Sequence, residues 1–133
     1  MTGKWMAIAG ALLAAVGVGL GAFGAHGLED YLRQLGREAN LAKRLAWFDT
    51  AVRYQLFHAL GMVVIAALAA GHASRWHRAA AGLFVVGIAL FCGSLYVMTF
   101  ADDAWKKLGM VTPLGGLAFI AGWVLVALAV WRK

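Results

Sequence analysis

Four long apolar stretches alternate with short charged segments along this chain of 133 residues. The stretches cover residues 5–25, 54–71, 79–101 and 108–131, and none of them contains Asp, Glu, Lys or Arg. About 20 apolar residues, each rising about 1.5 Å along a helix, cross a bilayer core of roughly 30 Å. The pattern therefore predicts a polytopic membrane protein.

The expected fold class is all-α, a four-helix transmembrane bundle with a short amphipathic interfacial helix between the first two spans. We expect the spanning helices at about residues 5–25, 51–71, 79–100 and 112–131, and a helical lead-in to the second span from Leu41. Because four spans with short connections leave no room for a second domain, residues 1–133 are expected to form a single transmembrane domain.

The start of the fourth helix has a local signal. Thr112 is a good N-cap residue, and Pro113 is favoured at the first helical position because the amide that it lacks would be unpaired anyway. Tryptophan supports the same layout, since its amphipathic ring prefers the level of the headgroups. Five of the six tryptophans fall at predicted helix ends: Trp5, Trp47, Trp76, Trp105 and Trp131.

Residues 28–50 differ from the spans because they combine charge with an amphipathic pattern. The pattern suits a short helix on the membrane surface, interrupted near Gly36. An ordinary polar loop with some helix is the alternative. The apolar positions at helical spacing are Leu28, Tyr31, Leu32, Leu35 and Ala39.

Composition narrows the class of protein further. The chain is 63% hydrophobic and 14% charged, whereas soluble proteins are about 25% charged. Its net charge of +6 comes from Lys and Arg at the ends of the apolar runs, as expected beside anionic headgroups, so no nucleic-acid partner is expected. Cys92 is the single cysteine, and we expect it to be buried and to pack as a small hydrophobic residue. We expect His72 and His77, beside a short connection, to be solvated.

No arrangement typical of an enzyme or a metal centre is visible. All acidic residues lie outside the spans, and no Ser-His-Asp set is apparent, which indicates a non-enzymatic protein. His26 and His58 lack the i, i+4 pairing of a helical metal motif, and there is no second thiolate. We therefore expect no metal and no other cofactor.

Four spans place both termini on one side of the membrane. We call this the terminal side, and we call the side with the two acidic connections the loop side. The terminal side has five basic residues and no acids, whereas the loop side has six basic residues and all six acids. The basic charges of the terminal side lie in shorter flanks, which favours cytoplasmic termini.

Polar side chains within the spans gather in the loop-side half of the predicted bundle. His58 and Ser94 are each seven residues from the loop-side interface, or about 10 Å deep. Ionisable residues are costly in a span, so they tend to face the interior and to mark function. The predicted intramembrane polar cluster consists of His26, Arg53, Tyr54, Gln55, His58, Ser94, Tyr96 and Thr112.

Arg53 and His58 each allow two interpretations. Arg53 can pair with Asp49 one turn earlier and hold an anion or a lipid headgroup, or it can simply extend to the interface. His58 can hydrogen-bond Ser94 or Tyr96 across helices, or it can carry protons or bind a metal.

Small residues predict close helix packing. Gly17, Gly21 and Ala25 repeat at four-residue intervals in the first span, and Ala118 and Gly122 repeat this spacing in the fourth. Such faces let helix backbones approach each other in lipid. The spacing leaves open whether they pack within one chain or between chains.

Four segments carry a family resemblance: GAFGAHGL (21–28), YQLFHALGM (54–62), FCGSLY (91–96) and TPLGGLAFIAGW (112–123). With them the chain resembles the small inner-membrane family of bacterial YgdD-like proteins, which has a vertebrate transmembrane relative. The resemblance implies four transmembrane helices in a bacterial inner membrane and carries no established activity. Cys92 stands where the family is expected to have Ser. The recurring residues are His26, Tyr54, Gln55, His58, Ser94, Tyr96, Thr112 and Pro113.

We expect a small integral membrane protein that interacts with lipids or acts in assembly, with a polar site on one leaflet side. Its expected partners are membrane lipids and either a second copy of the chain or another membrane protein. The alternatives are an accessory subunit of a larger complex, and a small transporter or proton-linked channel using Arg53, Tyr54 and His58. The scarcity of polar residues in the terminal-side half argues against transport.

Overall fold

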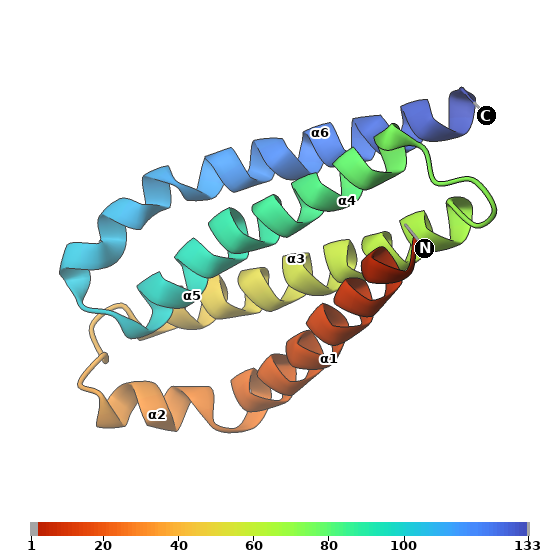
Figure 1. The fold of residues 1–133 in the computed structure, drawn as a ribbon. Coiled ribbons are helices and arrows are strands. Elements are labelled where there is room, and N and C mark those ends of the chain that lie inside the picture. The colour runs from red at the N-terminus through yellow and green to blue at the C-terminus, as the bar shows by residue number, and fades with distance from the viewer. Residues whose placement is uncertain (1–2, 133) are drawn as a thin grey trace.

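The computed structural model describes residues 3–132, and every regular element in this range is helical. Figure 1 shows the helices packed side by side along one another. The elements are α1 (Lys4–His26), α2 (Leu28–Gln34), α3 (Leu41–Leu68), α4 (Arg75–Gly87), the π-helix η1 (Ile88–Cys92), α5 (Gly93–Phe100), the 3₁₀-helix η2 (Asp103–Met110) and α6 (Thr112–Trp131).

Four helical units are long and apolar enough to cross a membrane. They are α1, α3, the continuous helix Arg75–Phe100 and the unit Asp103–Trp131. This confirms the predicted all-α fold with four spans. Helix α3 begins at Leu41, where the lead-in to the second span is predicted to start. One boundary differs from the prediction, because α4 begins at Arg75 rather than near residue 79.

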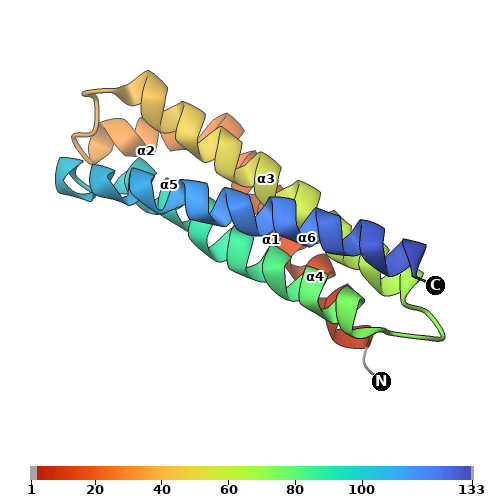
Figure 2. The same cartoon turned by 90° about the horizontal axis from the view of Figure 1, so that it is seen from above.

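The topology is up and down. The two chain ends lie at one end of the molecule, together with the connection between α3 and α4, and α2 lies at the opposite end with the connection between α5 and α6 (Figures 1 and 2). Helix α3 is central, because it packs against α1 on one side and against α4 and α5 on the other, while α6 packs along α4. Helix α1 is therefore at the edge of the bundle, with most of its apolar surface left for lipid.

Glycine lets α1 approach α3 closely. A Cβ atom at Gly10 would lie 2.7 Å from the carbonyl oxygen of Ala59, and a Cβ at Gly17 would lie 2.8 Å from the Leu56 side chain. Gly24 makes a similarly close contact with Phe48. These glycines repeat every seven residues, the period of a left-handed helix seam.

The four-residue spacing predicted for this face of α1 does not match the residues that are buried against α3. Gly17 lies in the contact, Gly21 is half-buried, and Ala25 is exposed. On α6, likewise, Gly122 is buried and Ala118 is half-buried. The buried small positions of α6 again follow a seven-residue repeat: Gly115, Gly122 and Ala129.

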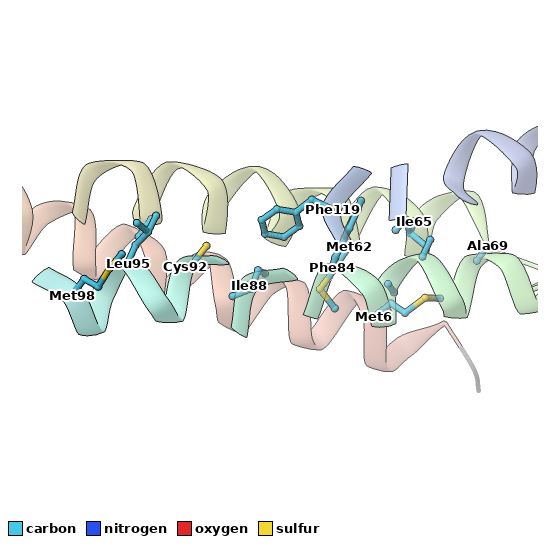
Figure 3. Packing of buried hydrophobic residues seen from close by; sticks show 13 residues of the cluster. Met6, Met62, Ile65, Ala69, Phe84, Ile88, Cys92, Leu95, Met98 and Phe119 are labelled. Carbon is cyan, nitrogen blue, oxygen red and sulfur yellow. The ribbon is translucent and has the colours of Figure 1, made fainter. Parts of the chain in front are cut away.

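The main apolar core runs along the length of the bundle between α3, α4, α5 and α6, with Met6 of α1 at one end (Figure 3). Met62, Phe84 and Phe119 fill its middle, and Ile65 lies on the terminal side of them. A smaller cluster at the loop side contains Leu28, Leu32, Phe48 and Val52, and it seats α2 against α3.

The predicted interfacial segment 28–50 is divided in the structure. Its first part is the short helix α2, as expected, and its last part forms the first turns of α3. Between them the chain reverses at Gly36 and Asn40, whose φ angles of 69° and 63° lie in the left-handed region. Glycine and asparagine adopt this region more readily than other residues do.

His77 is buried rather than solvated, contrary to the prediction. The backbone N–H of Ser74 donates to His77 Nδ1 at 3.2 Å, and the Ser74 hydroxyl lies 2.8 Å from the same nitrogen. The pair forms a capping box at the start of α4, which explains why this helix begins one turn earlier than hydropathy suggests.

Candidate functional site

Gln55 is the centre of the buried polar network. Its side chain is in the middle of α3, and the residue is only 3% exposed. The amide Nε2 donates to the backbone oxygen of Leu13 at 2.9 Å, and Oε1 accepts from the Tyr96 hydroxyl at 2.8 Å. One side chain therefore connects α1, α3 and α5, in surroundings where water does not compete for these bonds.

His58 lies one turn deeper on the same face of α3. Its Nδ1 is 2.6 Å from the Tyr54 carbonyl oxygen, and its Nε2 accepts from the Trp123 indole N–H at 3.2 Å. A carbonyl oxygen only accepts, so Nδ1 carries the proton and the ring is neutral. The ring also stacks on Phe119 with 3.5 Å between centroids. The predicted partners of His58, Ser94 or Tyr96, are wrong, because its side-chain partner is Trp123 on α6.

Ser94 and Thr112 join α5 to the start of α6. Their hydroxyl oxygens are 2.6 Å apart, and Ser94 also donates to the Phe91 carbonyl oxygen at 3.0 Å. Just before Ser94 the chain forms the π-helix η1, where a Cβ at Gly115 would lie 2.3 Å from the Phe91 backbone nitrogen. This is the closest packing of α6 against the third span among the described glycines.

Arg44 is a buried charged residue that the sequence prediction missed. It is 2% exposed. Its Nη1 lies within 2.9 Å of the carbonyl oxygens of Met98, Thr99 and Ala101, and its Nη2 donates to Asp103 at 3.1 Å. The last carbonyls of a helix have no intrahelical donor and carry the negative end of its dipole. Arg44 therefore caps the C-terminus of α5.

Arg37 completes this cap from the loop before α3. Its Nε donates to the Phe100 carbonyl oxygen at 3.1 Å. Two arginines, one in the connection after α2 and one in the first turn of α3, thus fasten the loop-side ends of the second and third spans together.

The spacing of the buried residues along α3 indicates that Arg44 is buried too. Buried residues follow alternating spacings of four and three, the seam pattern of a helix packed in a bundle. Arg44 is the first position of this seam, one step before Phe48, so extending the pattern backwards would have identified it as buried. The seam consists of Arg44, Phe48, Ala51, Gln55, His58, Met62, Ile65 and Ala69.

Three residues of the predicted cluster lie outside the buried network. Arg53 is on the outer face of α3, where it forms an ion pair with Asp49, and both side chains are more than 60% exposed. Tyr54 is 39% exposed and stacks on Phe91 with 4.5 Å between centroids. His26 is exposed at the end of α1. The predicted cluster is therefore divided into a buried network and a surface group, which consists of these three exposed residues.

His26 borders a cavity of about 460 Å³ between the end of α1, the start of α2 and the first half of α3. We call it the loop-side pocket. His26 and three carboxylates line it, and the aliphatic and aromatic side chains of the smaller core cluster form its wall. Its principal lining residues are Gly24, His26, Leu28, Glu29, Asp30, Leu45, Phe48, Asp49 and Val52.

The charges around the loop-side pocket are only partly compensated. Glu29 accepts a hydrogen bond from Arg33 at 2.8 Å, and this bond raises the pKa of the Arg33 guanidinium at the membrane surface. Asp49 pairs with Arg53, whereas Asp30 lines the cavity without a hydrogen bond or ion pair to another described side chain. Within residues 3–132, no three His, Cys, Asp or Glu side chains are placed to hold a metal ion.

Fold, composition and buried network together define a small integral membrane protein with four spans. The family described as "Protein of unknown function (DUF423)" matches residues 20–116. The chain belongs to this family.

Relatives named as membrane proteins cover nearly the whole chain. UPF0382 membrane protein YwdK of Bacillus subtilis is 42% identical over 127 residues, which is 95% of each chain. UPF0382 membrane protein SH2409 of Staphylococcus haemolyticus is 37% identical over 97% of each chain. UPF0382 inner membrane protein YgdD of Escherichia coli is 33% identical over 99% of this chain and 93% of its own. No solved structure matches the chain.

Proposed function

We propose that this protein is a non-enzymatic lipid-binding membrane protein whose loop-side pocket holds the headgroup of a phospholipid. The observation that carries the proposal is the cavity between α1, α2 and α3, which combines carboxylates with an apolar wall. Arg53 lies beside it through its pair with Asp49. A phospholipid has the same order of groups, with charge at the surface and hydrocarbon below.

The chemistry of the lining favours a headgroup that contains a primary ammonium. Glu29, Asp30 and Asp49 offer carboxylate oxygens, which make strong charge-assisted hydrogen bonds to N–H donors. Arg53 is the nearby cation for the phosphate. Phosphatidylethanolamine has both groups, whereas the trimethylammonium of phosphatidylcholine has no N–H to donate. The pocket should therefore prefer the ethanolamine headgroup.

The buried network supports this proposal over a transporter. Gln55, His58, Ser94 and Thr112 are hydrogen-bonded to protein groups, so they hold the helices in place. Towards the terminal side the core consists of apolar residues such as Met62 and Ile65. A hydrated path would need polar groups in that half as well.

Lipid titration of the purified full chain tests the proposal. Native mass spectrometry would compare phosphatidylethanolamine with phosphatidylcholine of identical acyl chains. Asp30→Asn/Asp49→Asn should reduce the preference for phosphatidylethanolamine about fivefold or more, or about 1 kcal/mol. Glu38→Gln/Asp102→Asn removes two exposed loop-side carboxylates that do not line the pocket, and it should keep the preference. An equal effect of both double variants, or no preference in the wild type, contradicts the proposal.

A further inference from the structure

Two arginines flank one tryptophan at the terminal side of the molecule. Arg75 and Trp76 begin α4, and Arg132 follows the end of α6. The guanidinium carbons of Arg75 and Arg132 lie 4.9 Å and 5.1 Å from the centroid of the Trp76 ring. Cation–π attraction to the indole holds both groups in place, so two segments distant in sequence present two cations around one ring.

A cavity of about 480 Å³ opens beside this arrangement, and both arginines line it. We call it the terminal-side cleft. It is separate from the loop-side pocket, since it lies at the opposite end of the spans (Figure 1). Its principal lining residues are His72, Ser74, Arg75, Trp76, Ala129 and Arg132.

The charge of the terminal-side cleft is not neutralised by acidic side chains. The two guanidiniums repel each other, and an anion bound beside both of them would offset this repulsion. The positive end of the α4 dipole lies at the same place and adds to the attraction. All acidic side chains of the sequence are at the other end of the molecule: Glu29, Asp30, Glu38, Asp49, Asp102 and Asp103.

The depth of the cleft indicates which anion it meets. The third span begins at Arg75, and the fourth ends at Trp131, so the two guanidiniums lie at the level of the lipid headgroups. The anion present there is the phosphate of a phospholipid, and a planar guanidinium binds phosphate oxygens through two parallel N–H bonds. Trp76 is suited to the same depth, because indole prefers the membrane interface.

We propose that the terminal-side cleft, formed by Arg75, Trp76 and Arg132, is a binding site for the phosphate of an anionic phospholipid in the terminal-side leaflet. This site goes beyond the proposed function, because it lies in the other leaflet and selects negative rather than positive headgroup charge. Removing carboxylates from the loop-side pocket should leave lipid binding at the terminal-side cleft unchanged, so either proposal can fail without the other.

The test is a titration of the purified full chain with phosphatidylglycerol, read by native mass spectrometry. Arg75→Gln/Arg132→Gln should raise the Kd for phosphatidylglycerol about tenfold. Lys4→Gln/Arg78→Gln removes the same charge from exposed positions on the same side and outside the cleft, and it should change the Kd less than about twofold. Arg75→Lys/Arg132→Lys keeps the charge but loses the paired N–H bonds, so its Kd should rise by an amount between those of the two glutamine variants.

Three results would overturn this assignment. An equal rise of the Kd in the Arg75/Arg132 and Lys4/Arg78 glutamine variants would mean that positive charge attracts phosphatidylglycerol wherever it lies on this side of the protein. An unchanged Kd in Arg75→Gln/Arg132→Gln would show that the cleft does not bind phosphatidylglycerol. Displacement of phosphatidylglycerol by inorganic phosphate at equal concentration would show that a free anion, rather than a lipid, is the occupant. Circular dichroism checks that each variant is folded. If Arg75→Gln/Arg132→Gln is not folded, the Kd of Arg75→Lys/Arg132→Lys is compared with that of the wild type instead.

Discussion

At the scale of single residues, buried polar side chains determine how the helices are held. The hydrophobic effect does not favour contact between helices in lipid, so interhelical hydrogen bonds and close packing decide the arrangement. Gln55 illustrates this, because its amide bonds to α1 and α5 at once. His58 does the same for α6 through Trp123.

The bond between Gln55 and Tyr96 should appear as a coupling energy. Gln55→Leu and Tyr96→Phe should each destabilise the protein, and the double variant should lose less than the sum of the two. The difference should be about 1 kcal/mol, a typical value for an interhelical hydrogen bond. Unfolding equilibria in mixed micelles would measure it. Strictly additive losses would show that this bond does not contribute to stability.

Arg44 should be the most sensitive charged residue of the chain. Arg44→Met leaves the buried carbonyl oxygens at the end of α5 without their donor, at an expected cost of about 2–4 kcal/mol. Lys43→Met removes the same charge from the neighbouring exposed position, and it should change stability by about 0.5 kcal/mol or less. Thermal unfolding in detergent measures both. Similar losses for the two variants would contradict the capping role.

At the scale of elements, the sequence predicted the four spans, and the start of α6 to within one residue, because length, hydropathy and the Thr112-Pro113 pair are local signals. Thr112 is the first helical residue rather than the predicted N-cap, which is Val111. The sequence also predicted that a helical lead-in to the second span begins at Leu41, but it did not predict that Arg44 in the first turn of this helix is buried. Arg44 is buried there only because the end of α5, more than 50 residues later, supplies its partners. The choice of Trp123 as partner of His58 is likewise set by tertiary packing.

Adjacent glycines on α6 test how close the spans must approach. A Cβ at Gly115 would lie 2.3 Å from the Phe91 backbone nitrogen, whereas a Cβ at Gly116 would meet the Phe91 ring at 3.8 Å, an ordinary contact. Gly115→Ala should destabilise by about 1–3 kcal/mol, because backbone must move. Gly116→Ala should be neutral or stabilising, since alanine is the better helix former. Denaturation curves that rank the two variants in the opposite order would contradict this packing.

At the scale of the whole molecule, the polar groups are distributed by depth. Buried side chains fix the bundle from within, the loop-side pocket has carboxylates at one surface, and the terminal-side cleft has arginines at the other. The hydropathy pattern indicated which half would be polar. It did not separate the buried network from the surface group, because Arg53 and Gln55 are two residues apart in sequence and face opposite surroundings. Cytoplasmic termini remain a prediction from charge.

The most direct measurement is the lipid content of the protein extracted in native-lipid discs from cells. Mass spectrometry would compare the wild type with Asp30→Asn/Asp49→Asn and with Glu38→Gln/Asp102→Asn. We predict that phosphatidylethanolamine is enriched around the wild type and the second variant relative to the bulk membrane, and that Asp30→Asn/Asp49→Asn loses this enrichment. Identical lipid profiles for all three proteins would contradict the central claim that the loop-side pocket binds a headgroup.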